Sequence, residues 1–210
     1  MVIQILSLGA LLFFSAPNIC AAPTQSEIAQ IQNSFKQMHD EDQVLINAEG
    51  TAWAKGPNSA DYKQAKIAFD QMMLRHISAL ESVIRKWGWP GISVFGLETD
   101  QNAWLVCQHA YRQSSFQKRC LNILEDAWKR GDTDNHNVPS LTDSIEKSEG
   151  RPQIFGTYGN PNKQGCWEWL PIADIEHADE RRARYNLPTL EQERKGYDRH
   201  YGCTPAAKAP

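Results

Sequence analysis

Apolar residues recur at helical spacing through the whole segment from Ser59 to Trp87. Positions three, four or seven apart share one face of an α-helix, so the pattern predicts one long amphipathic helix. Ser59 can cap its start, and the glycines and proline of 88–91 end it. Such a helix must bury its apolar face against other helices, which restricts the chain to a helical bundle. The apolar positions are Tyr62, Ala65, Phe69, Met72, Met73, Leu80, Ile84 and Trp87.

A second apolar stripe precedes the first and predicts another long helix, from about Ser26 to Ala48. The segment 50–58 contains two glycines and a proline, and is expected to form the loop between the two helices. The pattern over Ser114 to Gln117 is that of a capping box. Further helices are expected over about 100–111, 114–131, 139–147, 174–185 (capped by Asp174) and from a Thr189 cap onward.

Turn residues fill the segment 159–165, and strand-like residues lie on both sides of it. This arrangement predicts a β-hairpin over about 153–170. The expected fold class is therefore mostly α: an irregular bundle of six or seven helices with one small β-hairpin. We expect one α-helical domain over 23–203, with a helical pair at 23–88 and a second region at 89–203, followed by a disordered tail at 204–210.

The first 22 residues have no charged side chain, and their apolar core is short. Leu8 to Phe14 cannot span a bilayer, which needs about 20 apolar residues. The segment is typical of a secretory signal peptide that is cut after Ala21 or Ala22, although a buried N-terminal element or an uncleaved anchor remains an alternative. We expect a periplasmic or secreted protein with no stable membrane anchor after signal removal.

Four cysteines follow the expected signal, which is an even number, as in disulfide-bonded exported proteins. Cys107 and Cys120 would lie about 20 Å apart on one straight helix, so they can pair only if the chain turns between them, within 111–115. Cys166 and Cys203 would then tie the C-terminal segment to the body. The alternative is four buried thiols in a cytoplasmic protein. No metal-binding spacing of cysteine or histidine occurs, and we expect neither a metal nor a cofactor.

Three polar groups could form a site, and each has a purely structural alternative. Gln108 and His109 lie on the third predicted helix, where the imidazole could act as an acid or base. Arg181 and Arg182, near Glu180, could hold an anion or could form a solvated charged face. Residues Gln153 and Thr157 would lie on one side of a strand, with Gly156 allowing close approach of a ligand or of a packed helix.

Charge argues against one class of partner. The 22 Lys and Arg residues are outnumbered by 25 Asp and Glu residues, giving a net charge of −3. Nucleic-acid binding depends on a basic surface, so we expect no nucleic-acid partner.

Roughly residues 89–190 resemble the DUF6624 family, a bacterial family of unknown function. The resemblance covers many short pieces in consistent order: Trp89-Pro90, Ala103 to Ala110, Phe116-Gln117, Leu141 to Asp143, Gly150 to Gln153, Phe155 to Thr157, Pro171-Ile172 with Asp174, Asp179 to Arg182, and Leu187-Pro188. It implies no particular chemistry.

The sequence departs from the family's pattern at three positions. Tyr111 stands where the family has an acidic residue after His-Ala, Tyr158 where it has a glutamine after Gly-Thr, and Ser144 where an arginine often follows the Asp. Chemistry that depends on those groups is therefore not expected of this chain.

Two functions fit these observations. The first is an exported helical domain that binds an unidentified small molecule or protein partner in the bacterial cell envelope, because no known catalytic motif occurs. The alternative is a hydrolase-like enzyme in which His109 acts as the base and Asp143 or Glu180 orients it. In that case Arg181 or Arg182, with Gln153, would hold an anionic group.

Overall fold

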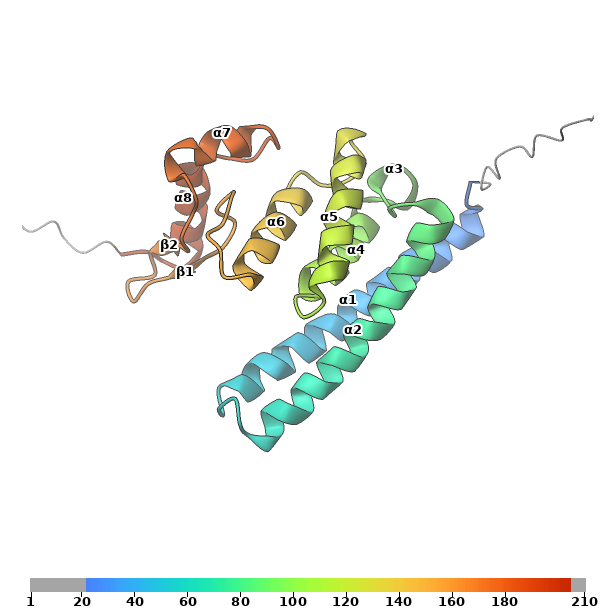
Figure 1. The fold of residues 1–210 in the computed structure, drawn as a ribbon, viewed down its shortest axis with the longest axis horizontal. Helices are drawn as coiled ribbons and strands as arrows, with labels where there is room; N and C mark the ends of the chain where they lie inside the picture. Colours follow the sequence, from blue (N-terminus) through green and yellow to red (C-terminus); the bar gives the residue numbers. More distant parts are fainter. Residues whose placement is uncertain (1–21, 205–210) are drawn as a thin grey trace, which may run out of the picture.

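A computed structural model describes residues 22–204. All but the last residue of the predicted signal peptide, including Cys20, and all but the first residue of the predicted tail lie outside the described residues. The fold class is confirmed: the described chain is mostly helical and has one two-stranded antiparallel sheet (Figure 1). The elements are α1 (Gln25–Trp53), α2 (Ala60–Trp87), α3 (Ile92–Phe95), α4 (Leu97–His109), α5 (Ser114–Lys129), α6 (Asn137–Ser148), β1 (Gly159–Pro161), β2 (Trp167–Trp169), the 3-10 turn η1 (Ile175–His177), α7 (Ala178–Ala183) and α8 (Leu190–His200).

The two long helices form the predicted hairpin. Ser59 caps α2 as expected, because its hydroxyl accepts the N–H of Tyr62 at 3.1 Å. Helix α1 ends at Trp53, five residues past the predicted end at Ala48. The loop expected over 50–58 is therefore shorter than its composition suggested. Ala52 in this extra turn is buried, and its packing outweighs the low helix propensity of Gly50.

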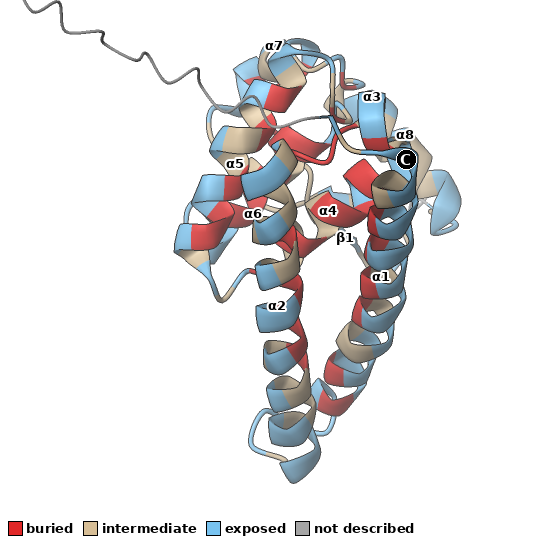
Figure 2. Cartoon of the chain, turned by 90° about the vertical axis from the view of Figure 1, so that its right-hand side faces the viewer, coloured by how far each residue is buried: buried red, intermediate tan, exposed pale blue. Residues whose placement is uncertain are grey.

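Helix α4 packs against both α1 and α2, and Figure 2 shows buried residues along much of its length. The outer halves of α1 and α2 project beyond the rest of the fold, and their buried residues face each other or the C-terminal end of α4 and the turn after it. The core residues Cys107, Leu80, Leu124 and Leu141 are fully enclosed. Truncating a leucine at such a position costs about 2–5 kcal/mol.

The disulfide Cys107–Cys120 is formed, with Cα atoms 6.1 Å apart. The turn over 110–113 brings α5 back against α4, as the cysteine spacing required. The capping box predicted over Ser114 to Gln117 is wrong. Gln117 instead donates from Nε2 to the carbonyl oxygens of Cys107 and Gln108, because this side chain is buried where the two helices meet.

A buried aspartate organises the loop before α6. Asp100 accepts hydrogen bonds from Trp89 Nε1 at 2.6 Å and from Thr133 Oγ1 at 2.7 Å. The N–H of Asp134 and the amide of Asn137 donate to its other oxygen, each at 3.0 Å. This loop is therefore held to the core by one carboxylate.

The sheet is smaller than the predicted hairpin. Its register pairs Gly159 with Trp169 and Pro161 with Trp167, whereas the segment 153–158 is irregular apart from a single bridge from Gln153 to Ile172. The expected alternation of side chains along 153–157 is wrong. A buried carboxylate on α6 binds the backbone N–H groups of this segment, and Gly156 adopts a left-handed φ of 69°, so no ladder can form.

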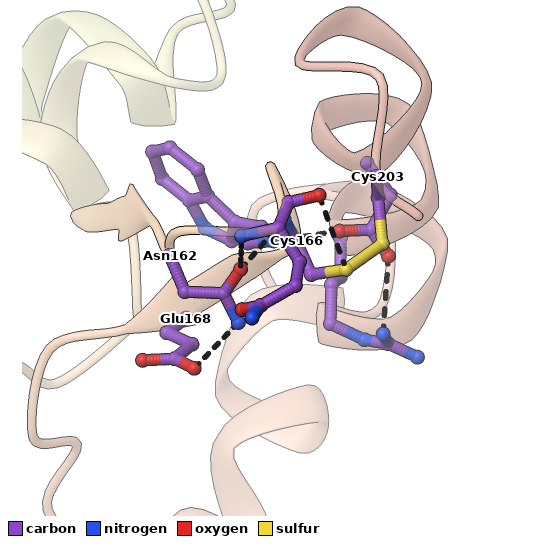
Figure 3. The surroundings of a disulfide bond; sticks show 8 residues. Asn162, Cys166, Glu168 and Cys203 are labelled. Atoms are coloured by element: carbon purple, nitrogen blue, oxygen red, sulfur yellow. Dashed lines mark hydrogen bonds and ion pairs between the residues drawn. A yellow bond between two sulfur atoms is a disulfide. The ribbon is translucent and has the colours of Figure 1, made fainter. Parts of the chain in front are cut away.

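The C-terminal part contains the second disulfide, Cys166–Cys203, with Cα atoms 4.3 Å apart. In Figure 3, Asn162 lies beside Cys166 and Glu168 and braces the hairpin turn: its oxygen accepts the N–H of Cys166 at 3.0 Å, and its amide donates to Glu168 at 2.8 Å. The expected cap of a long helix at Asp174 is wrong, since this residue has φ 44° and precedes only a 3-10 turn.

No helix within residues 22–204 is both long and apolar enough to cross a membrane.

Candidate functional site

A polar cleft of about 360 Å³ opens where the C-terminal end of α4 meets α6. We call it the His109 cleft. Side chains from α4, the following turn, α6 and the segment before β1 line it, and none of them is acidic. The lining residues are Gln108, His109, Tyr111, Ser144, Lys147, Ser148 and Tyr158.

His109 is held from behind by a carboxylate on α1. Its Nδ1 lies 2.8 Å from one oxygen of Asp42 and 2.9 Å from the other. The Asp42 side chain is 4% exposed and that of His109 is 19% exposed. Because a carboxylate only accepts hydrogen bonds, the proton is on Nδ1 and Nε2 is left as the free acceptor. Among the described residues Nε2 has no hydrogen-bond partner.

Tyr158 links the cleft to the segment before β1. Its hydroxyl accepts a hydrogen bond from the Gln108 amide. Burial raises the pKa of Tyr158, so the phenol keeps its proton. The side-chain oxygen of Gln108 is buried and has no partner among the described residues. The wall of the cleft thus presents hydroxyl and amide groups in fixed positions.

Lys147 is the cationic side chain of the cleft. Its Nζ lies 3.9 Å from the centre of the Tyr158 ring, a cation–π contact. Within residues 22–204, no carboxylate forms an ion pair with it. Although Lys147 is an exposed residue, desolvation by its neighbours lowers the pKa of its ammonium group. A bound anion would offset that desolvation.

Asp143 does not orient His109 in this structure. It is fully buried, and its two oxygens accept the N–H groups of Ile154, Phe155 and Thr157 together with the Thr157 hydroxyl, at 2.7–2.9 Å. Burial raises the pKa of this carboxyl, and the hydrogen bonds act in the opposite direction. Asp143 and Thr157 therefore fix the segment that positions Tyr158.

Gln153 also serves this segment. Its amide donates to the carbonyl oxygens of Tyr158 and Leu170, each at 3.0 Å, and its oxygen accepts the N–H of Tyr158 at 2.6 Å. All the polar atoms of this buried side chain are thereby bound to backbone, and none is presented to a ligand.

The two arginines bind backbone rather than an open anion site. Arg181 donates from Nε to the carbonyl of Ile154 at 2.9 Å and from Nη2 to that of Ala173 at 2.6 Å. Arg182 is fully buried and donates to the carbonyls of Pro188 and Phe155, at 2.6 and 2.8 Å.

Arg182 also pairs with the carboxylate of Glu193. Glu180 is exposed on α7. The predicted groups thus meet around the segment 153–158 without converging on the imidazole: α7 binds one part of the segment, and α4 contacts Tyr158.

Sequence reasoning missed Asp42, which is the acidic partner of His109. A signal was present, because the buried stripe of α1 continues at alternating spacings of three and four, and two acidic residues occupy it. Asp42 follows Met38 by four positions, and Glu49 follows Asp42 by seven. An acid on an apolar stripe is costly to bury without a partner, so each of these positions indicated one. Lys147 had no comparable signal, and Ser144 and Tyr158 stood out only as departures from the family's pattern.

The three positions at which the sequence departs from the family's pattern, Tyr111, Ser144 and Tyr158, all line the His109 cleft. A metal is not indicated there: residues 22–204 contain no group of three or more His, Cys, Asp or Glu side chains that could hold one.

Comparison with family models found one match, to a family of unknown function, DUF6624, over residues 29–204. The match starts in α1, so it includes the helical pair that the resemblance over 89–190 left out. Asp42 therefore lies inside the matched region. The searches of curated proteins and of solved structures found no match.

Proposed function

The chain belongs to the DUF6624 family, and on that premise we propose that it is an exported protein of the bacterial cell envelope that binds an anionic small molecule in the His109 cleft. The observation that supports this most directly is the charge of the cleft. Lys147 has no carboxylate partner among the described residues, and no acidic side chain lines the cleft.

The neutral groups of the cleft fit the same ligand class. Carboxylate and phosphate oxygens accept several hydrogen bonds each, and the hydroxyl groups of Ser144 and Tyr158, which line the cleft, can donate them. The ligand class that fits the cleft is therefore an anion that accepts these hydrogen bonds.

Export is supported by the leader-like segment 1–22 and by the two disulfides, which are rare in cytosolic proteins. Mass spectrometry of protein purified from its native cells tests this directly. We expect an N-terminus at Ala22 or Pro23 and no alkylatable thiol before reduction. An intact leader with four free thiols would rule export out.

Binding is tested by isothermal titration calorimetry with phosphate, acetate and citrate, and with glycerol as a neutral reference. We expect at least one anion to bind with measurable heat. Lys147→Met should lower the affinity for that anion by about tenfold or more. His109→Gln should also weaken binding. Lys163→Met is the matched control, because Lys163 is exposed in the turn between β1 and β2, away from the cleft. Equal affinities in all three variants would reject the site.

A hydrolase is the second candidate, and the Asp42–His109 pair favours it. A carboxylate that fixes the Nδ1 proton leaves Nε2 ready to take a proton from water or from a hydroxyl group. Hydrolysis of p-nitrophenyl acetate provides a first assay. We expect His109→Gln to lower the rate by about a hundredfold if His109 is the general base. A rate equal to that of wild type would leave ligand binding as the function.

A further inference from the structure

A second groove lies next to the His109 cleft, between the outer ends of α1 and α2 and the turn after α4. It measures about 400 Å³, and three of its walls are aromatic: Trp53, Tyr62 and Tyr111. We call it the aromatic groove. Tyr111 lines both this groove and the His109 cleft, so the two hollows meet at that side chain. The assignment below of a ligand carboxylate to the His109 cleft rests on the proposed function.

Trp53 makes the groove unusual for a surface. It is the last residue of α1 and exposes 55% of its surface, although an indole is the largest apolar side chain. The edge-to-face contact with Tyr62, with ring centroids 5.1 Å apart and planes at 73°, holds the indole in place. A flat, fixed and open aromatic face can pack against another flat apolar surface at little cost in side-chain entropy.

The floor of the groove is polar and equally fixed. Glu49 is buried and accepts hydrogen bonds from the Tyr111 hydroxyl at 3.3 Å and from the Arg112 guanidinium. Arg112 also pairs with Asp70 on α2, at 2.8 Å. Burial raises the pKa of Tyr111 to about 12, so its hydroxyl remains a donor and acceptor. Charged planar groups therefore lie directly beside apolar ring faces.

This combination selects among ligand chemistries. A fatty chain would shield the ion pairs of Arg112 with Glu49 and Asp70 from water without adding hydrogen bonds to them, which is unfavourable. A sugar ring has an apolar C–H face that packs on an aromatic ring, and hydroxyl groups around its edge that bond to carboxylate and guanidinium groups. We infer that the ligand is a saccharide of at least two rings that carries a carboxylate: its rings lie in the aromatic groove, and its carboxylate lies in the His109 cleft near Lys147.

Two disaccharides that differ in one lactyl ether group, which carries a carboxylate, test this inference by calorimetry. N-acetylglucosaminyl-N-acetylmuramic acid has a lactyl carboxylate, and N,N′-diacetylchitobiose lacks it. We expect the acidic disaccharide to bind about tenfold more tightly than the neutral one. Lys147→Met should abolish that difference. Trp53→Ala should weaken both by about tenfold, and Trp53→Phe, which keeps a ring, should weaken them less.

Leu74→Ala is the matched control, because Leu74 is an exposed apolar residue on α2 outside the groove. Affinities unchanged by Trp53→Ala would overturn the inference and leave the binding of simple anions intact. If neither disaccharide gives binding heat at about 10 mM, any affinity is far weaker than that of a specific site. This result would overturn the saccharide class. Tighter binding of AMP than of the acidic disaccharide would overturn it in favour of a nucleotide.

Discussion

The carboxylate of Asp42 lies 2.8 Å from Nδ1 of His109, although the two residues are 67 positions apart. The contact joins α1 to the last residue of α4, at the edge of the His109 cleft. It fixes which ring nitrogen carries the proton and which one a ligand can reach.

Asp42→Asn should remove this control over the imidazole. An asparagine offers either an oxygen or an amide group to Nδ1, so both tautomers become accessible. Long-range ¹H–¹⁵N spectra at about pH 8, where an ordinary imidazole is neutral, report the tautomer. We expect one form in wild type, with the proton on Nδ1, and a mixture in the variant. Asp40→Asn, on the exposed side of α1, is the control. A wild-type proton on Nε2 would contradict the assignment.

As the pH rises, anion affinity should be lost at a lower pH than it would be with a lysine of ordinary pKa. Desolvation lowers the pKa of Lys147 below 10.5, and an anion needs the protonated form. Affinity should therefore decrease as the pH rises through that lowered pKa. Lys147→Arg should keep affinity at higher pH, because a guanidinium stays protonated. Identical pH profiles for the two proteins would show that Lys147 does not contact the anion.

The same shift sets the sign of an effect on stability. The folded state holds the Lys147 proton less tightly than the unfolded state does, so this group makes the fold more stable as the pH rises through its lowered pKa. Lys147→Met should accordingly keep or raise the melting temperature while it weakens binding. A lowered melting temperature would mean that Lys147 stabilises the fold.

Arg182→Met should destabilise the protein strongly. The side chain is fully buried and donates to the carbonyls of Pro188, Phe155 and Gly156 and to Glu193, and the substitution removes all of these hydrogen bonds. Breaking a buried ion pair costs about 3–5 kcal/mol, which urea unfolding can measure. Arg184→Met, at an exposed position on the same segment, should have little effect. Normal stability with lost anion binding would instead favour the arginine clamp.

The two disulfides should contribute to stability in different places. Replacing Cys107 and Cys120 by alanine opens a 13-residue loop and should lower the free energy of unfolding by about 3 kcal/mol. Replacing Cys166 and Cys203 should mainly release α8 from β2. Hydrogen exchange should then rise over 190–200 and stay unchanged in α4. Uniform exchange across both segments would show that the C-terminal part unfolds together with the bundle.

Much of the fold could be predicted from the chain's own pattern. The helices of the hairpin follow from apolar periodicity, and Ser59 and Thr189 cap α2 and α8 as their side chains allow. These features depend on neighbours within about one helical turn, so local sequence contains the information. The cysteine spacing also required a turn between Cys107 and Cys120, and the turn over 110–113 provides it.

The site was decided by tertiary contacts. The segment 153–158 has strand-like residues, but the carboxylate of Asp143 on α6 takes up its N–H groups and prevents a ladder. His109 was recognised as a candidate, yet its partner was not, because Asp42 reaches it only when α4 packs against α1. Side-chain periodicity identifies the face that a helix buries. Which buried polar groups meet across that face depends on how the helices pack, and only the folded chain determines this.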